Sequence, residues 1–374
     1  MTNIMTSSTK ISQPKVNLGR FFEDFVLNEV IIHATPRTIT AGDCSLYIAL
    51  YGSRNPLHCS EPFAQSLGYS NKNNLSTPVD DLLAFHIAFG KTVPDISVNA
   101  VANLGYADVR FLQPVFVGDT LSTSSQVIGL KQNSNAKSGV VWVRSTSTNQ
   151  RGEPVLSWVR WVMIHKDASH KSDLNRTAPM TSVPTLPSFV APENLNIPST
   201  FSAKNYDGNA TGGQYFWEDY QVGERINHAA GMTINPADHT MATRLYQNNA
   251  RLHFDDYMMR TSSFGQRLVY GGVAISMCRS LSFEGLENAL SILAINAGTH
   301  ANPSFAGDTI YCATEVLETW VLANKDLGAL RLRMVGIKNM SPNEIAEFKT
   351  ETGYHPNVVL DLDYTVAMPH REKA

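Results

Sequence analysis

The sequence predicts an α+β fold that is built twice, with an antiparallel sheet wrapped around one buried helix in each half. Three observations predict it. The stretch Phe21–Phe25 aligns without gaps with Phe216–Tyr220, and this match begins a long internal repeat. Each copy contains one helical segment that is apolar on all sides, as buried helices are. Each copy then continues in period-2 runs, such as Trp142–Thr146, which are typical of antiparallel strands with one wet face.

The internal repeat indicates a duplication. Over about forty aligned positions, about fourteen residues are identical, where chance gives about two or three. The identities include His33 with His228, and Leu57–His58 with Leu252–His253. Further along, residues 113–120 match residues 302–309 at a Pro, a Phe and a Gly-Asp-Thr run.

Both copies predict the same elements in the same order. Each begins with a short strand (Val30–His33; Arg225–His228), a helix (Gly42–Tyr51; Asp238–Tyr246) and a turn that carries a histidine. A second helix (Ser60–Gly68; Asp255–Arg260) precedes the apolar helix (Asp80–Gly90; Gly271–Leu281). The strands that follow are Ala107–Phe116, Asp119–Leu130, Gly139–Thr148 and Val155–His165 in the first copy, and Ile292–Phe305, Asp308–Leu322, Gly328–Lys338 and Asn357–Met368 in the second.

These elements divide the chain into four parts. Residues 1–18 form a polar tail, 19–165 the first half, 166–213 a connection and 214–374 the second half. The connection is rich in Ser, Asn, Thr and Pro, so it cannot bury much apolar surface. A connection of this length is uncommon within one compact domain, which favours two halves that dock.

Composition excludes several classes of function. The net charge of -3 gives no electrostatic basis for binding nucleic acid or an anionic membrane. No apolar run reaches the length of a membrane helix, and the N-terminal residues lack the apolar core of a secretory signal. The four cysteines contain no CxxC pair, which argues against a zinc knuckle. The chain is therefore expected in the reducing cytoplasm.

Several motifs resemble the MaoC-like (R)-specific enoyl-CoA hydratases. They are the turn Asn55–His58, the buried helix after it, and the Pro-x-x-x-Gly-Asp-Thr sequence that opens a strand in each half. Within that family the chain is most similar to mesaconyl-CoA hydratases (β-methylmalyl-CoA dehydratases), at residues 19–24, 49–54, 78–86 and 101–106. The resemblance covers nearly all of residues 19–170 and 214–371. It implies the hotdog fold, here a double hotdog with two sheets, each around a long helix.

The resemblance leaves open which half is catalytic. In the hydratase motif an aspartate precedes the histidine by five positions, but here those positions hold Ser53 and Asn248. The first half keeps Asn55 of the motif. The buried helix favours the second half, because it begins with Gly271 and Gly272, whose N–H groups a substrate can approach closely. The first half has two aspartates there, which would cap those donors and repel an oxyanion. We therefore expect catalysis in the second half and a binding or scaffold role for the first.

Roles for individual residues follow from this choice. His253 is the expected proton shuttle, because imidazole titrates near neutral pH. Asn248 cannot accept a proton, so it would orient water or the substrate carbonyl. Gly271 and Gly272 would hold the enolate oxygen through their N–H groups. The other candidates are Asp255 to orient His253, Arg251 and Arg244 to bind a substrate carboxylate, and His58 with Asn55 as an alternative site.

The expected function is reversible hydration of a branched, carboxylated enoyl-CoA, with mesaconyl-CoA giving β-methylmalyl-CoA. The CoA thioester is the substrate, and no metal or redox cofactor is expected. The resemblance also implies a homo-oligomer, a dimer or larger. Three alternatives stay open: a MaoC-like hydratase for another enoyl-CoA, a hotdog thioesterase that uses Asp255, and a non-catalytic acyl-CoA-binding protein, which the missing aspartates would favour.

Overall fold

A computed structural model describes residues 15–71, 75, 77–167, 181–323 and 326–373 of the chain. Most of the predicted tail and residues 168–180 of the predicted connection lie outside these ranges. Among the described residues, the strands of the first half end at His165 and those of the second half begin at Arg225. The four-part division of the chain agrees with these positions but stays a prediction in its boundaries.

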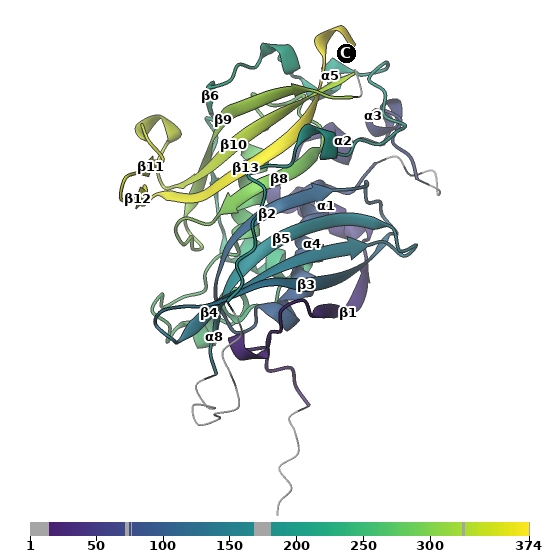
Figure 1. Cartoon of the computed structure of the whole chain (residues 1–374). Helices are drawn as coiled ribbons and strands as arrows, with labels where there is room; N and C mark the ends of the chain where they lie inside the picture. The colour runs from purple at the N-terminus through teal and green to yellow at the C-terminus, as the bar shows by residue number, and fades with distance from the viewer. Residues whose placement is uncertain (1–14, 72–74, 76, 168–180, 324–325, 374) are drawn as a thin grey trace, which may run out of the picture.

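One eleven-stranded antiparallel sheet runs through both halves, in the order β1-β3-β4-β5-β2-β8-β13-β10-β9-β6, with β7 also paired to β9 (Figure 1). The strands are β1 (Val30–Thr38), β2 (Ala100–Phe111), β3 (Thr120–Gln132), β4 (Ser138–Thr148), β5 (Pro154–His165), β6 (Arg225–Asn227), β7 (Met232–Thr233), β8 (Ile292–Thr299), β9 (Thr309–Val321), β10 (Leu327–Lys338) and β13 (Val358–Pro369). A separate small hairpin joins β11 (Lys349–Thr350) to β12 (Gly353–Tyr354).

The two predicted sheets are joined edge to edge into one continuous sheet. The seam is the antiparallel pair β2 and β8, where Tyr106 lies opposite Gly298 and Arg110 opposite Ala294. A free sheet edge exposes unpaired N–H and C=O groups, and pairing the two inner edges satisfies them. The two hotdogs therefore share backbone hydrogen bonds as well as side-chain contacts.

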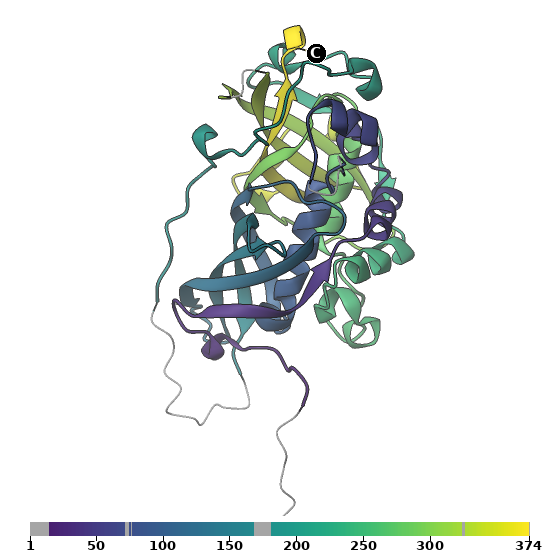
Figure 2. The same ribbon diagram turned by 90° about the vertical axis from the view of Figure 1, so that its right-hand side faces the viewer.

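Helices of both halves gather on one side of the sheet, as Figure 2 shows. They are α1 (Ala41–Tyr51), α2 (Pro56–Cys59), α3 (Glu61–Ser66), α4 (Asp81–Ile96), α5 (Gly208–Thr211), α6 (Pro236–Leu245), α7 (Arg251–Phe254), α8 (Asp256–Met259) and α9 (Gly271–Leu281). Helix α1 begins with a capping box, in which Thr40 accepts from the N–H of Asp43 and Asp43 accepts from the N–H of Thr40. Among the described residues, no helix has the length and apolar character needed to cross a bilayer.

Several predicted elements have different bounds in the structure; β1 continues past His33 to Thr38, and β8 ends at Thr299 instead of Phe305. The apolar helix of the first half does not end at Gly90 but continues to Ile96. Gly90 marks a close contact, because a Cβ there would lie 1.8 Å from the carbonyl oxygen of Tyr246. Strand β2 begins at Ala100, seven residues before the predicted start at Ala107. The sequence pattern missed this start because Gly105 is a poor strand former. In the structure, the ring of Trp161 occupies the place that a Cβ on Gly105 would take.

The central helices α4 and α9 belong to one apolar core that both halves supply. Phe85 and Leu83 of α4 and Met277 of α9 are buried in the same cluster. Hydrogen bonds cross between the halves inside it: Tyr51 Oη lies 2.8 Å from Tyr246 Oη. The core therefore places the two histidine turns at fixed positions relative to both central helices.

Candidate active site

The histidine of each half lies in a one-turn helix, His58 in α2 and His253 in α7. Its ring is held in the same way in both halves. His58 Nδ1 donates to the carbonyl of Pro78 at 3.2 Å, and His253 Nδ1 donates to that of Leu268 at 3.0 Å. Since a carbonyl only accepts, Nδ1 of each ring carries a proton.

A cavity of about 260 Å³ opens beside His253, between the two halves. Its walls are mainly apolar, with Val93, Leu252, Val269 and Ala274 among them. The polar and ionisable side chains that line it include Asn248, His253 and His300 from the second half, and Asn103, Tyr106 and Arg160 from the first. An apolar cavity with a few convergent polar groups is the usual form of a small-molecule site.

The imidazoles in this cavity are neutral. Burial lowers the pKa of His253 to about 4, and the pKa of His300 falls to about 4 through burial and the neighbouring His253. His300 Nε2 lies 3.0 Å from Tyr106 Oη across the seam between the halves. The ring of His253 is therefore neutral and can accept a proton at Nε2, but its lowered pKa makes it a weaker base than the ring titrating near neutral pH that we expected from the sequence.

The start of α9 offers free amide donors to the same cavity. Its N-cap, Tyr270, has no side-chain acceptor for the first helical N–H groups. Among the described residues, no oxygen accepts from the N–H of Gly271 or Gly272, as expected for the first turn of a helix without a cap. Gly271 lines the cavity, and the ring of His300 occupies the place that a Cβ on Gly271 would take.

The structure brings together some of the predicted residues but not all. Asn248 is 2% exposed, lines the cavity beside His253, and accepts from the N–H of Ala250 through Oδ1. Gly272 does not line the cavity, because its α-carbon packs against the rings of Tyr270 and His86. A contribution from Gly272 would therefore be limited to its N–H.

Three predicted charged residues lie outside the cavity. Arg244, Arg251 and Asp255 are exposed, and none of them lines it. Asp255 instead caps α8 by accepting from the N–H of Met258 at 2.9 Å. The placement of Asp255 removes the basis for the thioesterase alternative, which required a carboxylate close to the thioester. It also corrects the expectation that Arg244 or Arg251 supplies the cavity with a cation.

Arg160, His300 and Tyr106 line the cavity and were not predicted to do so. The internal repeat could have pointed to His300. When residues 302–309 are matched to 113–120, His300 aligns with Phe111, so a histidine in the second half replaces an apolar residue of the first. The alternation of β5 could have pointed to Arg160, because Arg160 shares its inward face with Trp158 and Val162. An arginine on the inward face of a strand is unusual enough to mark a site.

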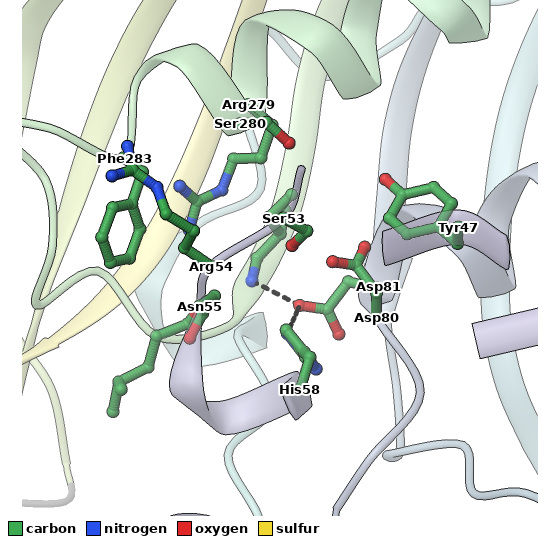
Figure 3. A pocket seen from close by; sticks show the side chains of 12 residues that line it. Tyr47, Ser53, Arg54, Asn55, His58, Asp80, Asp81, Arg279, Ser280 and Phe283 are labelled. Atoms are coloured by element: carbon green, nitrogen blue, oxygen red, sulfur yellow. Dashed lines mark hydrogen bonds and ion pairs between the residues drawn. The ribbon is translucent and has the colours of Figure 1, made fainter. Parts of the chain in front are cut away.

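The first half contains a different constellation around His58, shown in Figure 3. His58 Nε2 lies 3.7 Å from a carboxylate oxygen of Asp81, the first residue of α4. Asp81 also accepts from the N–H of Ile292 at 2.8 Å, and burial raises the pKa of its carboxyl to about 6. The space between these groups is about 20 Å³, enough for a single water. Asn55 caps α2 and donates to the carbonyl of Leu290, so it fixes the turn.

A larger space of about 350 Å³ is also lined by His58 and Asp81, together with residues 196–200 of the connection. The helix start differs from that of α9, because Asp80 accepts from the N–H of Leu82 at 2.9 Å. An acidic, capped helix start disfavours a developing oxyanion. The geometry therefore favours the cavity at His253 over that at His58.

The fold places the chain among known proteins. A solved MaoC-domain dehydratase from Chloroflexus aurantiacus is 54% identical to this chain and superimposes on it with a TM-score of 0.90. The match covers 96% of this chain and 100% of the other. A Mycobacterium tuberculosis protein with a double hotdog fold superimposes over 94% of this chain and 98% of its own length with a TM-score of 0.71, at 22% identity. The chain is thus a MaoC-like double-hotdog protein, as the sequence predicted.

Sequence comparison identifies the family within that class. The family model for mesaconyl-CoA hydratase matches residues 7–341. The chain is 55% identical to the β-methylmalyl-CoA dehydratase of Chloroflexus aurantiacus, over 96% of this chain and 99% of that protein. It is 51% identical to the mesaconyl-CoA hydratase of Cereibacter sphaeroides, over 95% and 99% of the two chains. This chain belongs to the mesaconyl-CoA hydratase family, a family of hydro-lyases.

Proposed function

We propose that this chain adds water reversibly to mesaconyl-CoA and gives β-methylmalyl-CoA, with the reaction in the cavity at His253. The activity is that of relatives which match this chain over nearly its full length at 55% and 51% identity. One observation carries the choice of site. His253, whose Nδ1–H is used on the carbonyl of Leu268 so that Nε2 is unprotonated, lines the same cavity as Gly271, which begins a helix without a side-chain cap.

The proposed chemistry uses two features of the cavity. His253 Nε2 accepts a proton from water while the hydroxide adds to the double-bond carbon that bears the carboxylate. The electron pair of the double bond moves to the thioester, and the resulting enolate oxygen accepts from the amide of Gly271, which lines the cavity. The proton then returns to the carbon that bears the methyl group, so that H and OH have added across the bond. The free side-chain amide of Asn248 orients the water or the thioester carbonyl.

The experiment is a comparison of two matched variants, His253→Gln and His58→Gln. Glutamine keeps hydrogen-bonding capacity at each turn but cannot accept a proton. We expect His253→Gln to lower kcat for mesaconyl-CoA hydration by about 10²–10⁴-fold, the usual contribution of a general acid–base group. His58→Gln should keep kcat within a few-fold. The rate is followed by loss of the enoyl absorbance, with release of free thiol as a control for thioester hydrolysis.

The opposite pattern would place the reaction in the first half. If His58→Gln abolished hydration and His253→Gln did not, the His58–Asp81 pair would be the acid–base group. If the wild-type chain gave neither substrate loss nor thiol release but bound CoA esters measurably, the acyl-CoA-binding alternative would hold. A cytoplasmic homo-oligomer remains our proposal for the state of the protein, and light scattering of purified protein tests the assembly.

A further inference from the structure

Arg160 is a buried guanidinium on β5 that lines the same cavity as His253, although the two residues belong to different halves. The residue is 1% exposed. One terminal nitrogen donates to Thr92 Oγ1 at 2.8 Å, and both terminal nitrogens lie 3.4 Å from Ser97 Oγ. Its carbon Cζ lies 4.3 Å from the centre of the Phe89 ring. These contacts hold the group in place with neutral partners alone.

No carboxylate among the described residues pairs with this guanidinium. Its Nε has no hydrogen-bond acceptor at all within that part of the chain. Burial lowers the pKa of the Arg160 guanidinium to about 10, so it still carries its charge at neutral pH. A buried charge is normally paired, because desolvation without a partner costs several kcal/mol.

Other strand arginines in this protein show the ordinary arrangement. Arg331 of β10 pairs with Glu318 at 3.0 Å and with Asp363 at 2.6 Å. Arg333 pairs with Glu315 and Asp361. Arg160 is more deeply buried than either and is the one that faces the cavity. The missing anion is therefore best sought in the ligand.

We propose that Arg160 binds the free carboxylate of the substrate and makes the cavity selective for enoyl thioesters that carry one. The inference rests on the proposed function, since it concerns the same cavity. A guanidinium offers two parallel N–H donors to a carboxylate, which fixes the orientation of the ligand as well as binding it. In mesaconyl-CoA this carboxylate is attached to the carbon that receives the hydroxyl group. Holding it against Arg160 orients that carbon within the cavity that His253 lines.

Selectivity follows from the same charge. An enoyl-CoA that ends in a methyl group would leave the buried guanidinium unpaired and would bind more weakly. Contacts with the apolar walls, by contrast, are similar for both kinds of ligand. The cation thus lies on the half that we do not assign to catalysis, which gives the first half a defined part in substrate recognition.

The test uses two thioesters without a double bond to hydrate, succinyl-CoA and butyryl-CoA, which differ only in this group; succinyl-CoA is prepared fresh because its own carboxylate slowly cleaves the thioester. Their dissociation constants are measured by calorimetry for the wild-type chain, Arg160→Met and the control Arg331→Met. We expect the wild-type chain and Arg331→Met to bind succinyl-CoA at least about 30-fold more tightly than butyryl-CoA. Arg160→Met should lose that preference while its affinity for butyryl-CoA stays the same or improves.

Steady-state rates provide a second measurement. For Arg160→Met, kcat/KM should fall by about 30-fold or more with mesaconyl-CoA and should not fall with crotonyl-CoA. If Arg160→Met does not fold, Arg160→Lys replaces it, and a reduced preference for succinyl-CoA with unchanged butyryl-CoA affinity supports the proposal. The proposal is overturned if the wild-type chain shows no preference, or if the folded Arg160 variant keeps the wild-type preference.

The two proposals fail in different ways. If the chain prefers succinyl-CoA through Arg160 but does not hydrate mesaconyl-CoA, the carboxylate subsite is supported and the proposed reaction is wrong. If the chain hydrates mesaconyl-CoA through His253 but its preference for succinyl-CoA does not depend on Arg160, the reaction is supported and the subsite is wrong.

Discussion

At the scale of single residues, the two halves differ most at the first position of the central helix. His58 and His253 have the same ring orientation, because each donates from Nδ1 to a carbonyl before the helix. The residue that begins the helix is Asp81 in the first half and Gly271 in the second. One side places a carboxylate near Nε2, and the other leaves amide donors free. A carboxylate disfavours a developing oxyanion and free amide donors favour one, which is why we propose the reaction in the second half.

Buried histidines predict how stability depends on pH. Burial lowers the pKa of His86 and His239 to about 3, and that of His253 and His300 to about 4, from 6.5. Between about pH 6.5 and 4 the unfolded chain therefore binds more protons than the folded one, so stability falls as the pH falls. We expect the free energy of unfolding to be several kcal/mol lower at pH 5 than at pH 7.5, because each of the four lowered pKa values contributes about 2 kcal/mol between these pH values.

Asp81 acts in the opposite direction, since its raised pKa stabilises the folded state as the pH falls below about 6. Because four histidines outweigh one aspartate, the net effect of lowering the pH is a loss of folding stability. Urea unfolding at several pH values measures it, and an unchanged or higher stability at pH 5 would show that the histidines are not buried as neutral rings.

At the scale of elements, the contact between α4 and the end of α6 depends on a glycine. A Cβ on Gly90 would lie 1.8 Å from the carbonyl oxygen of Tyr246, a backbone atom that cannot move aside cheaply. The same region carries the hydrogen bond between Tyr51 and Tyr246. Close approach of these elements is therefore part of how the two halves dock.

The variant Gly90→Ala should destabilise the protein by about 2 kcal/mol or more, because overpacking forces the backbone apart. The control is Gly42→Ala in the first turn of α1, where the nearest atom to an added Cβ is Thr40 Oγ1 at 3.6 Å. There alanine should be neutral or slightly stabilising, since it favours helix. Denaturant midpoints measure both, and equal midpoints for the two variants would contradict the close contact.

At the scale of the whole molecule, the halves share both a sheet and a core. The β2–β8 seam continues the hydrogen-bonded ladder from one half to the other. The largest apolar cluster contains residues of α4 and α9 together. Neither half can lose its structure without exposing apolar surface of the other.

Thermal unfolding should therefore give one cooperative transition. Calorimetric and van't Hoff enthalpies should agree, and Gly90→Ala in the first half should move the entire transition to lower temperature. Differential scanning calorimetry makes the measurement. Two resolved transitions, with only one of them shifted by Gly90→Ala, would mean that the halves unfold independently.

The sequence by itself determined the duplication, the order of elements and the histidine turns, because these depend on periodicity and on patterns within short segments. The double hotdog class came from the resemblance of its motifs to the MaoC-like hydratases. The sequence also led to His253, Asn248 and Gly271, which the structure brings to one cavity. Only the tertiary structure decided which arginine faces that cavity. Arg244 and Arg251 are close to His253 in the chain but exposed, whereas Arg160 reaches the cavity from β5 of the other half. Docking across the β2–β8 seam creates that proximity, and no local pattern in the sequence encodes it.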